Sequence, residues 1–230
     1  MTAALIEQLK RAAAQAAVAE IQAGMIVGLG TGSTAAFAIE ALAARVAEGL
    51  AVDAVATSLH TADAARASGI RIVDFAEVAT IDLCIDGVDE IDPSLRAIKG
   101  AGGAMLREKI VAASAARMIA IADVSKEVPR LGARPVPVEF LAFAGAFIER
   151  RITELGGLPR FRRTGAGAPY ATDQGNPVLD CAFGSIDDPN ALDAALSGCP
   201  GILGHGLFLS EIDTVYVGTE QGVSRRDRQF

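Results

Sequence analysis

Three short polar loops, each placed directly after an apolar run, constrain the fold of this chain most. They occupy residues 28–34, 86–90 and 99–103, where glycines alternate with hydroxyls, carboxylates or an amine. The apolar runs are typical of buried strands, and open α/β sheets bind ligands in the loops at the carboxyl ends of parallel strands. The pattern therefore predicts an α/β fold with one composite site for a small anion.

Alternating helix and strand patterns extend this prediction along the first part of the chain. Apolar residues at helical spacing predict helices, and short apolar runs predict strands. Helices are expected at residues 3–23, 35–48, 60–68 and 104–116, and strands at residues 25–29, 51–56, 70–74, 81–85 and 117–122. The alternation predicts a Rossmann-like, mainly parallel sheet with helices on both faces.

The pattern changes after about residue 131 and predicts a smaller α+β lobe. Prolines in residues 134–138 favour an extended edge or linker segment, and Asp188 followed by Pro189 predicts the start of a helix. Further elements are expected as helices at 140–154 and 190–197, and as strands near 159–163, 177–183 and 200–204. This β-α-β-β-α-β order is typical of a ferredoxin-like unit.

The strand expected at 213–218 is predicted to rejoin the first domain. We therefore predict a Rossmann-like catalytic domain at residues 1–131 and 206–230, with the ferredoxin-like lobe at residues 132–205.

Composition narrows the class of partner. The net charge is −7, there is no Lys/Arg-rich run, and Trp is absent, which argues against nucleic acid and acidic membrane surfaces as partners. No apolar run approaches the ~18 residues that span a bilayer, and the first residues lack a signal-peptide pattern. Three cysteines without metal-ligand spacing indicate a reducing compartment, so we expect a cytoplasmic protein.

The glycine loop at residues 28–34 lies between a predicted strand and a predicted helix. Backbone amides at a helix start attract anions, and Thr31, Ser33 and Thr34 add hydroxyl donors. Ser33 stands where the dinucleotide fingerprint has its third glycine, and the P-loop lysine is missing. A phosphate or sugar hydroxyl is therefore a better ligand here than NAD or ATP, while a plain capped turn is the alternative.

In the acidic turn, Asp86 and Asp89 lie three residues apart around Gly87. Such a pair can bind vicinal hydroxyls, shuttle protons or hold a divalent cation. The spacing is not that of a calcium loop, so we predict no metal. A solvated acidic turn is the alternative.

Two further residues are candidates for charge and proton chemistry. Lys99 ends an apolar stretch beside glycine amides and can neutralise an oxyanion or a phosphate. Glu108 is the one polar member of an apolar helix stripe, which makes it a candidate general base, although an ordinary helix acid fits too.

Lys126 follows the strand at 117–122 in another carboxyl-end loop, whereas the position of Lys10 off its helix stripe favours a solvated lysine.

Together these motifs resemble the ribose-5-phosphate isomerase family, type A. Residues 27–34, 85–91, 99–104, 107–109 and 121–126 carry the resemblance, and residues 135–139, 155–157, 172–176 and 206–208 fit as well. The resemblance covers nearly the whole chain. It implies interconversion of D-ribose 5-phosphate and D-ribulose 5-phosphate in the non-oxidative pentose phosphate pathway, without metal or organic cofactor, by a homodimer or homotetramer.

The resemblance also implies roles for individual residues. Glu108 would accept the proton that moves between C2 and C1 through an enediolate, and Lys99 would stabilise the oxyanion. Asp86 and Asp89 would bind substrate hydroxyls, with Asp86 assisting ring opening. The other substrate-binding residues would be Lys10, Thr31, Gly32, Ser33, Thr34, Gly87, Val88, Gly100, Ala101, Gly102 and Lys126.

Two positions depart from the family pattern: Val88 stands where Ala is frequent, and Ala101 stands where Gly is frequent. A Cβ at Ala101 would strain a positive φ there by roughly 1 kcal/mol or more.

Two rival functions stay open. A coenzyme A transferase with a glutamate nucleophile would form an acyl-enzyme, whereas the isomerase would exchange solvent deuterium into the sugar. A sugar-phosphate sensor would not need Asp86, Lys99 and Glu108 together.

Overall fold

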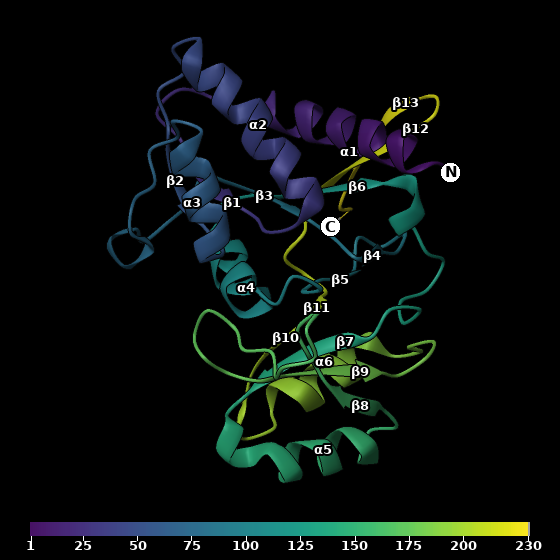
Figure 1. The fold of residues 1–230 in the computed structure, drawn as a ribbon. Coiled ribbons are helices and arrows are strands. Elements are labelled where there is room, and N and C mark those ends of the chain that lie inside the picture. The colour runs from purple at the N-terminus through teal and green to yellow at the C-terminus, as the bar shows by residue number, and fades with distance from the viewer. Residues whose placement is uncertain (230) are drawn as a thin grey trace. The chain divides into compact units, whose positions relative to one another are not determined.

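The computed structural model describes residues 1–229 and divides the chain into two compact units (Figure 1). The first unit comprises Met1–Val88, Arg107–Glu127 and the chain from Ser210 on. The second comprises Asp89–Leu106 and Val128–Leu209. Each unit contains its own sheet and its own buried apolar cluster.

The first unit is built on a six-stranded sheet with the order β13-β12-β6-β3-β1-β2. Its strands are β1 (Ile26–Leu29), β2 (Asp53–Ala56), β3 (Leu83–Gly87), β6 (Met118–Asp123), β12 (Thr214–Thr219) and β13 (Gly222–Asp227). All neighbouring pairs are parallel except the β12–β13 hairpin. The prediction of a mainly parallel sheet is confirmed. The prediction of a strand at residues 70–74 is wrong, because this segment pairs with β2 only through an isolated bridge between Ile72 and Ala54.

Helices cover both faces of this sheet, as predicted. They are α1 (Ala3–Val18), α2 (Ser33–Ala47), α3 (Leu59–Ala67) and α4 (Met105–Ala113). On one face, Ala13 and Ala17 of α1 and Leu42 of α2 share a buried cluster with Val27 and Leu29 of β1. On the other face, α4 packs so closely on β1 that a Cβ at Gly28 would lie 2.8 Å from the Val111 side chain.

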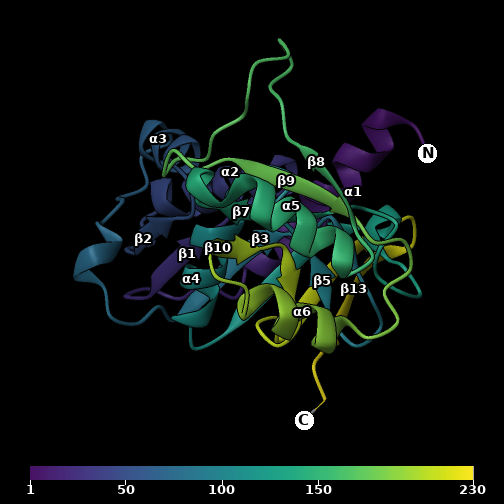
Figure 2. The same cartoon turned by 90° about the horizontal axis from the view of Figure 1, so that it is seen from below.

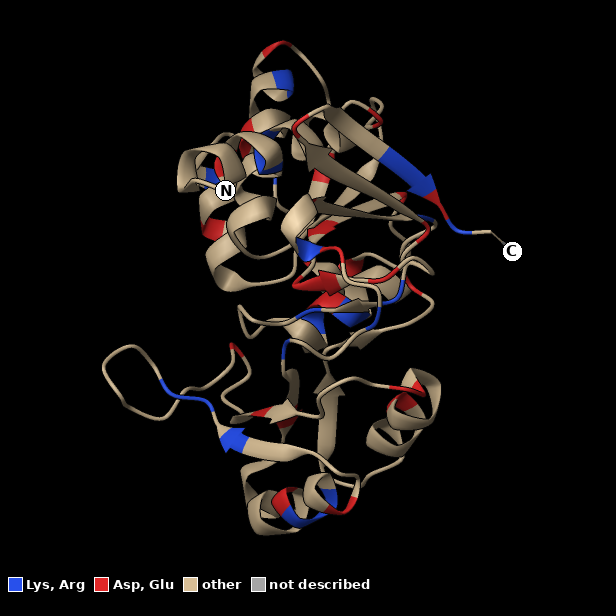
Figure 3. Ribbon diagram, turned by 90° about the vertical axis from the view of Figure 1, so that its right-hand side faces the viewer, with Lys and Arg blue, Asp and Glu red and all other residues tan. Residues whose placement is uncertain are grey.

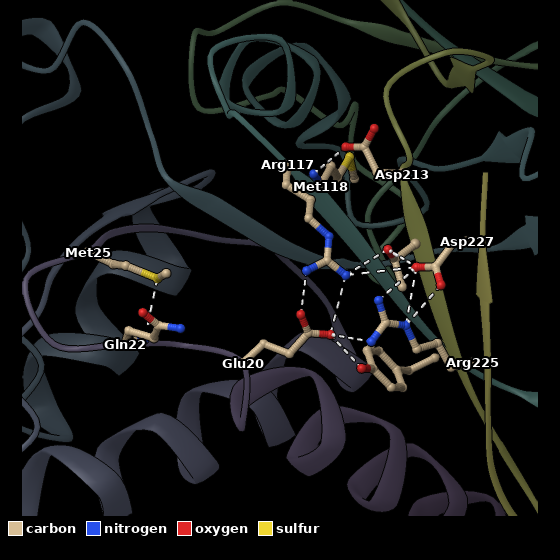
Figure 4. A network of polar contacts seen from close by, with 10 residues as sticks. Glu20, Gln22, Met25, Arg117, Met118, Asp213, Arg225 and Asp227 are labelled. Atoms are coloured by element: carbon tan, nitrogen blue, oxygen red, sulfur yellow. Dashed lines mark hydrogen bonds and ion pairs between the residues drawn. The ribbon is translucent and has the colours of Figure 1, made fainter. Parts of the chain in front are cut away.

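Helix α1 was expected to reach residue 23 but ends at Val18. The next residues form tighter turns, with the amides of Glu20 and Ile21 donating to carbonyls three residues back. These turns bring the Glu20 carboxylate to Arg117 and to the hydroxyl of Tyr216 (Figure 4). The end of α1 is thereby tied to the start of β6 and to β12.

The same polar network continues onto β13. Arg225 lies 3.7 Å from Glu20 and 3.0 Å from Asp227 (Figure 4). Burial acts to raise the pKa of Glu20, but hydrogen bonds from Arg117 and Tyr216 and the two arginine charges together lower it below its ordinary value. Hydrogen bonds from Arg225 and Thr214 lower the pKa of Asp227 in the same way.

The second unit contains an antiparallel sheet with the order β10-β7-β9-β8. Its elements in chain order are β7 (Val136–Phe140), α5 (Gly145–Glu154), β8 (Leu158–Phe161), β9 (Val178–Ala182), α6 (Pro189–Ser197) and β10 (Ile202–His205). This is the predicted β-α-β-β-α-β order. As expected, Asp188 caps α6, and its carboxylate accepts from the Ala191 amide at 3.0 Å.

Strand β7 corrects the expectation that residues 134–138 form an edge or linker. It lies between β10 and β9. Proline is tolerated because the polar backbone groups of Pro137 face away from β9, and its carbonyl accepts from the Gly206 amide at 2.8 Å. The missing N–H therefore removes no bond to β9.

A small antiparallel sheet, which the sequence pattern did not predict, completes the second unit. It joins β4 (Glu90–Ile91), β5 (Ala97–Ile98) and β11 (Leu207–Phe208) in the order β11-β5-β4. Strand β5 leads directly into Lys99, so this sheet holds the start of the polar loop at residues 99–103, the lysine loop. Figure 2 shows that the connection between β8 and β9 extends well beyond these two strands.

Charged residues of both signs are interspersed along the chain, and α5 carries both (Figure 3). Within residues 1–229, none of the helices has the length and apolar character that a bilayer crossing requires.

Candidate active site

In the first unit, the glycine loop after β1 lies directly against Asp86 at the end of β3. Asp86 is buried (1% exposed), and its Oδ1 accepts from the amides of Thr31 (3.1 Å) and Gly87 (2.7 Å). A Cβ at Gly30 would lie 1.9 Å from that oxygen, so only glycine allows this approach. The predicted meeting of two polar loops at one sheet edge holds for this pair.

The hydroxyl of Thr31 lies in a cluster that the sequence reasoning missed. Its Oγ1 is 2.8 Å from the hydroxyls of both Thr57 and Ser58 and 3.1 Å from that of Thr61. Thr61 in turn donates to the Gly30 carbonyl at 3.0 Å. These residues follow β2 and begin α3, so the order Thr-Ser-x-x-Thr after an apolar run was the available signal. These hydrogen bonds stabilise the glycine loop, and the Thr31 hydroxyl takes part in them.

Ser33 and Thr34 begin α2 and differ in exposure. Ser33 is exposed, and Lys10 of α1 donates to its Oγ at 2.9 Å. Lys10 is therefore held at the glycine loop, although its helix pattern favoured a solvated lysine. Thr34 is buried, and a Cβ added at Gly87 would lie 3.5 Å from the Cβ of Thr34. An ammonium, a helix N-terminus and a hydroxyl thus meet here, which suits an anion.

Glu108 lies in the first turn of α4 on its buried face. Its side chain is 2% exposed, and Met105, Val111 and Ala112 are buried on the same helix. The predicted burial of Glu108 on the apolar face of its helix is confirmed. Keeping an ionisable group from water is costly, so such a position is typical of groups with a chemical or pairing role.

Lys126 ends a short 3₁₀ turn, Val124–Lys126, that follows β6. Asp123 forms this turn, because its Oδ1 accepts from both the amide and the hydroxyl of Ser125. Lys126 is half-buried. The turn therefore places an ammonium in a loop at the carboxyl end of the same sheet that carries Asp86.

In the second unit, Lys99 is among the largest fully buried side chains (1% exposed). Its Nζ lies 5.4 Å from the centre of the Phe208 ring, a cation–π contact. Its amide donates to the Gly206 carbonyl at 2.9 Å, which pins the end of β5 beside β11. Gly206 therefore fixes the backbone of Lys99, and Phe208 contacts its ammonium group.

The loop after Lys99 is a hydrogen-bonded turn, with the Gly103 amide donating to the Gly100 carbonyl at 2.9 Å. Gly100 and Gly103 have φ of +96° and +81°. Ala101 is not among the described non-glycine residues with positive φ, so the strain considered for its Cβ is absent. Its amide donates to the Oδ2 of Asp89 at 2.9 Å.

Each unit thus brings together part of the predicted site. The first groups Lys10, Thr31, Gly32, Ser33, Thr34, Asp86 and Gly87 around the glycine loop; the second joins Asp89 to Ala101 and seats Lys99 on Phe208. Val88, which lies between Asp86 and Asp89 in the sequence, is buried. Within residues 1–229, no group of three His, Cys, Asp or Glu side chains is arranged to hold a metal ion.

Comparison with known proteins identifies the family. The family model for ribose 5-phosphate isomerase A (phosphoriboisomerase A) matches residues 53–222. The chain belongs to this family. Members of the ribose 5-phosphate isomerase A family are aldose–ketose isomerases, so this chain is an isomerase. The family and fold class inferred from the sequence are confirmed, and membership favours the isomerase over the transferase and the sensor.

Individual relatives match over nearly their whole length. Ribose-5-phosphate isomerase A of Roseiflexus sp. (strain RS-1) is 50% identical over 217 residues, 93% of this chain and 93% of the relative. The enzyme of Sphingopyxis alaskensis is 48% identical over 219 residues, 95% of this chain and 96% of the relative.

Solved structures agree in fold. Ribose 5-phosphate isomerase A from Methanocaldococcus jannaschii has a TM-score of 0.92 and 37% identity, covering 96% of this chain and 99% of that one. A D-ribose-5-phosphate isomerase in complex with phospho-erythronic acid has a TM-score of 0.94 and 35% identity, covering 97% and 99%.

Proposed function

We propose that this enzyme interconverts D-ribose 5-phosphate and D-ribulose 5-phosphate through an enediolate, in the non-oxidative pentose phosphate pathway. The observation that carries the proposal is the burial of Glu108 in the first turn of α4. Moving a hydrogen between adjacent carbons needs one base that takes a proton from C2 and returns it to C1. A carboxylate shielded from water keeps that proton close to the substrate.

Lys99 stabilises the negative charge that develops on the substrate oxygens as the proton leaves carbon. Its ammonium is fully buried, and a charge acts more strongly where water is excluded. Its contact with Phe208 and the hydrogen bond of its backbone hold it in place, so little reorganisation is needed in the transition state.

Asp86 and Asp89 bind the substrate hydroxyls, and Asp86 assists opening of the sugar ring. Two amide donors fix one oxygen of Asp86, and the Ala101 amide fixes one oxygen of Asp89. Each carboxylate is therefore oriented before substrate binds, which lowers the entropy cost of positioning.

The phosphate is held by the glycine loop, the lysine loop and the two flanking lysines. At the glycine loop, Gly32, Ser33 and Thr34 offer the start of α2, and Lys10 adds a positive charge. The proposed phosphate-binding residues also include Gly100, Ala101, Gly102 and Lys126. The phospho-erythronic acid bound by a related isomerase, a sugar acid with a phosphate, supports an acyclic sugar phosphate as the ligand class.

We also propose a homo-oligomer in the cytoplasm. The second unit has exposed apolar side chains near the edge strand β8 and the start of α5, namely Leu141, Phe143, Leu158 and Phe161. Covering them with a second copy removes apolar surface from water. Light scattering on the purified chain tests this, and a strictly monomeric mass would contradict it.

The direct test of the proposed function is conversion of ribose 5-phosphate by the purified chain, followed by ¹H NMR. We expect ribulose 5-phosphate to accumulate to a fixed equilibrium ratio from either direction. Ribose without the phosphate is the control and should react far more slowly. No interconversion of the two pentose phosphates would contradict the proposal.

A further inference from the structure

The turn after Lys99 has its carbonyl groups held by side chains from another part of the second unit. Nη1 of Arg162 donates to the carbonyls of Gly100 at 2.9 Å and Ala101 at 3.2 Å. The Tyr170 hydroxyl donates to the Gly102 carbonyl at 3.2 Å. The carbonyls of three successive residues thus accept from Arg162, which directly follows β8, and from Tyr170 in the long β8–β9 connection (Figure 2).

Binding the carbonyls determines where the amides of the turn point. In a planar trans peptide the C=O and the N–H point in opposite directions. The amides of Ala101 and Gly102 therefore face away from Arg162. The Ala101 amide donates to Asp89 at 2.9 Å, so one peptide group is held by Arg162 at its carbonyl and by Asp89 at its amide.

Arg162 is itself held firmly. Its Nε donates to Oδ2 of Asp180 at 3.0 Å, and its Nη2 contacts Oδ1 of the same carboxylate. The Tyr170 ring centre lies 5.5 Å from its guanidinium carbon. The side chain is only 11% exposed. Its planar fork therefore serves the carboxylate and the two carbonyls at once, which a lysine cannot do.

We propose that Arg162 is a positioning residue for substrate binding, because it sets the direction of the peptide groups after Lys99 and thereby the orientation of Asp89. This inference rests on the proposed function, in which the turn and Asp89 bind the sugar phosphate. Arg162 acts through the backbone and does not touch the reacting atoms.

Steady-state kinetics of Arg162→Met test this inference in the full chain. We expect KM for ribose 5-phosphate to rise about tenfold or more, with kcat within about threefold, because ground-state hydrogen bonds are lost. Arg162→Lys should not restore KM. Arg163→Met is the matched control, since Arg163 is exposed and its side chain donates to the Gly167 carbonyl within the connection. Its KM should equal that of the wild type.

A second readout does not depend on turnover. Without substrate, the ¹⁵N–¹H signals of Ala101 and Gly102 should shift in Arg162→Met and stay in place in Arg163→Met. An unchanged KM, or amide signals that do not move, would overturn the positioning role. So would a loss of thermal stability in Arg162→Met with no change in KM, which indicates a purely structural role.

The two proposals fail in distinguishable ways. If the wild-type chain does not convert ribose 5-phosphate, the proposed function is wrong, and the amide signals alone decide whether Arg162 orients the turn. If the wild type is active and Arg162→Met matches it in KM, the proposed function stands and the positioning role is wrong.

Discussion

At the scale of single residues, the contact between Gly30 and Asp86 leaves no room for a side chain. An added Cβ would overlap the Asp86 carboxylate, because its oxygen would be only 1.9 Å away. For Gly30→Ala we expect kcat/KM to fall about tenfold or more, since Asp86 must move, and unfolding to become about 1–3 kcal/mol easier. Kinetics and urea denaturation measure the two effects.

Gly165→Ala is the control for that substitution. A Cβ at Gly165 meets nothing within 4 Å, and this residue does not have a positive φ. It should leave kcat/KM and stability near the wild-type values. Equal kinetics for Gly30→Ala and the wild type would show that the position of Asp86 is not needed for turnover.

Several residues of the proposed site could be singled out one by one: Asp86 and Lys99 follow apolar strands, and Glu108 is polar on an apolar helix stripe. Asp86, Lys99 and Glu108 stand out from their sequence neighbours by type alone, and all are buried. Arg162 and Tyr170 could not be found in this way. Their contacts with the lysine loop depend on how the second unit folds, and arginine and tyrosine in a polar loop carry no local signal.

At the scale of elements, the end of α1 is attached to β12 and β13 by Glu20, Arg117 and Arg225 (Figure 4). The pKa of Glu20 is lower in the folded chain than its ordinary value, despite its partial burial. Its contribution to stability is therefore present above the unfolded pKa and is lost as pH falls through the folded pKa.

For Glu20→Gln we expect lower stability than the wild type near neutral pH and a smaller loss on acidification between about pH 5 and pH 3. Urea midpoints across this range measure it. Glu7→Gln, at an exposed position on α1, is the matched control. Parallel curves for Glu20→Gln and the wild type would mean that this carboxylate does not contribute to acid unfolding.

Helices and strands could be predicted where the spacing of apolar residues was clearly helical or extended. The predicted boundaries were wrong where tertiary contacts determine them. Helices α2 and α6 start within two residues of their expected positions, because glycine or a capping aspartate marks each start. The strand expected at 70–74 failed because Ile72 has a partner only at Ala54. β7 was misplaced at an edge, since nothing in the local sequence shows that Pro137 directs its carbonyl to Gly206.

At the scale of the whole molecule, the chemistry proposed here needs no metal ion. Asp86 and Asp89 each use one oxygen to accept backbone amides, which suits binding of sugar hydroxyls. Exhaustive treatment with EDTA should therefore leave kcat and KM unchanged. Loss of activity that Mg²⁺ restores would return the aspartate pair to the role of metal ligands.

The central claim is that Glu108 carries the proton between C2 and C1. In D₂O, ribulose 5-phosphate made by the wild type should gain deuterium at C1, as ¹H NMR reports. Glu108→Gln should slow both product formation and deuterium uptake by about a thousandfold, while Glu7→Gln matches the wild type. Turnover and deuterium uptake by Glu108→Gln within about tenfold of the wild type would contradict the claim.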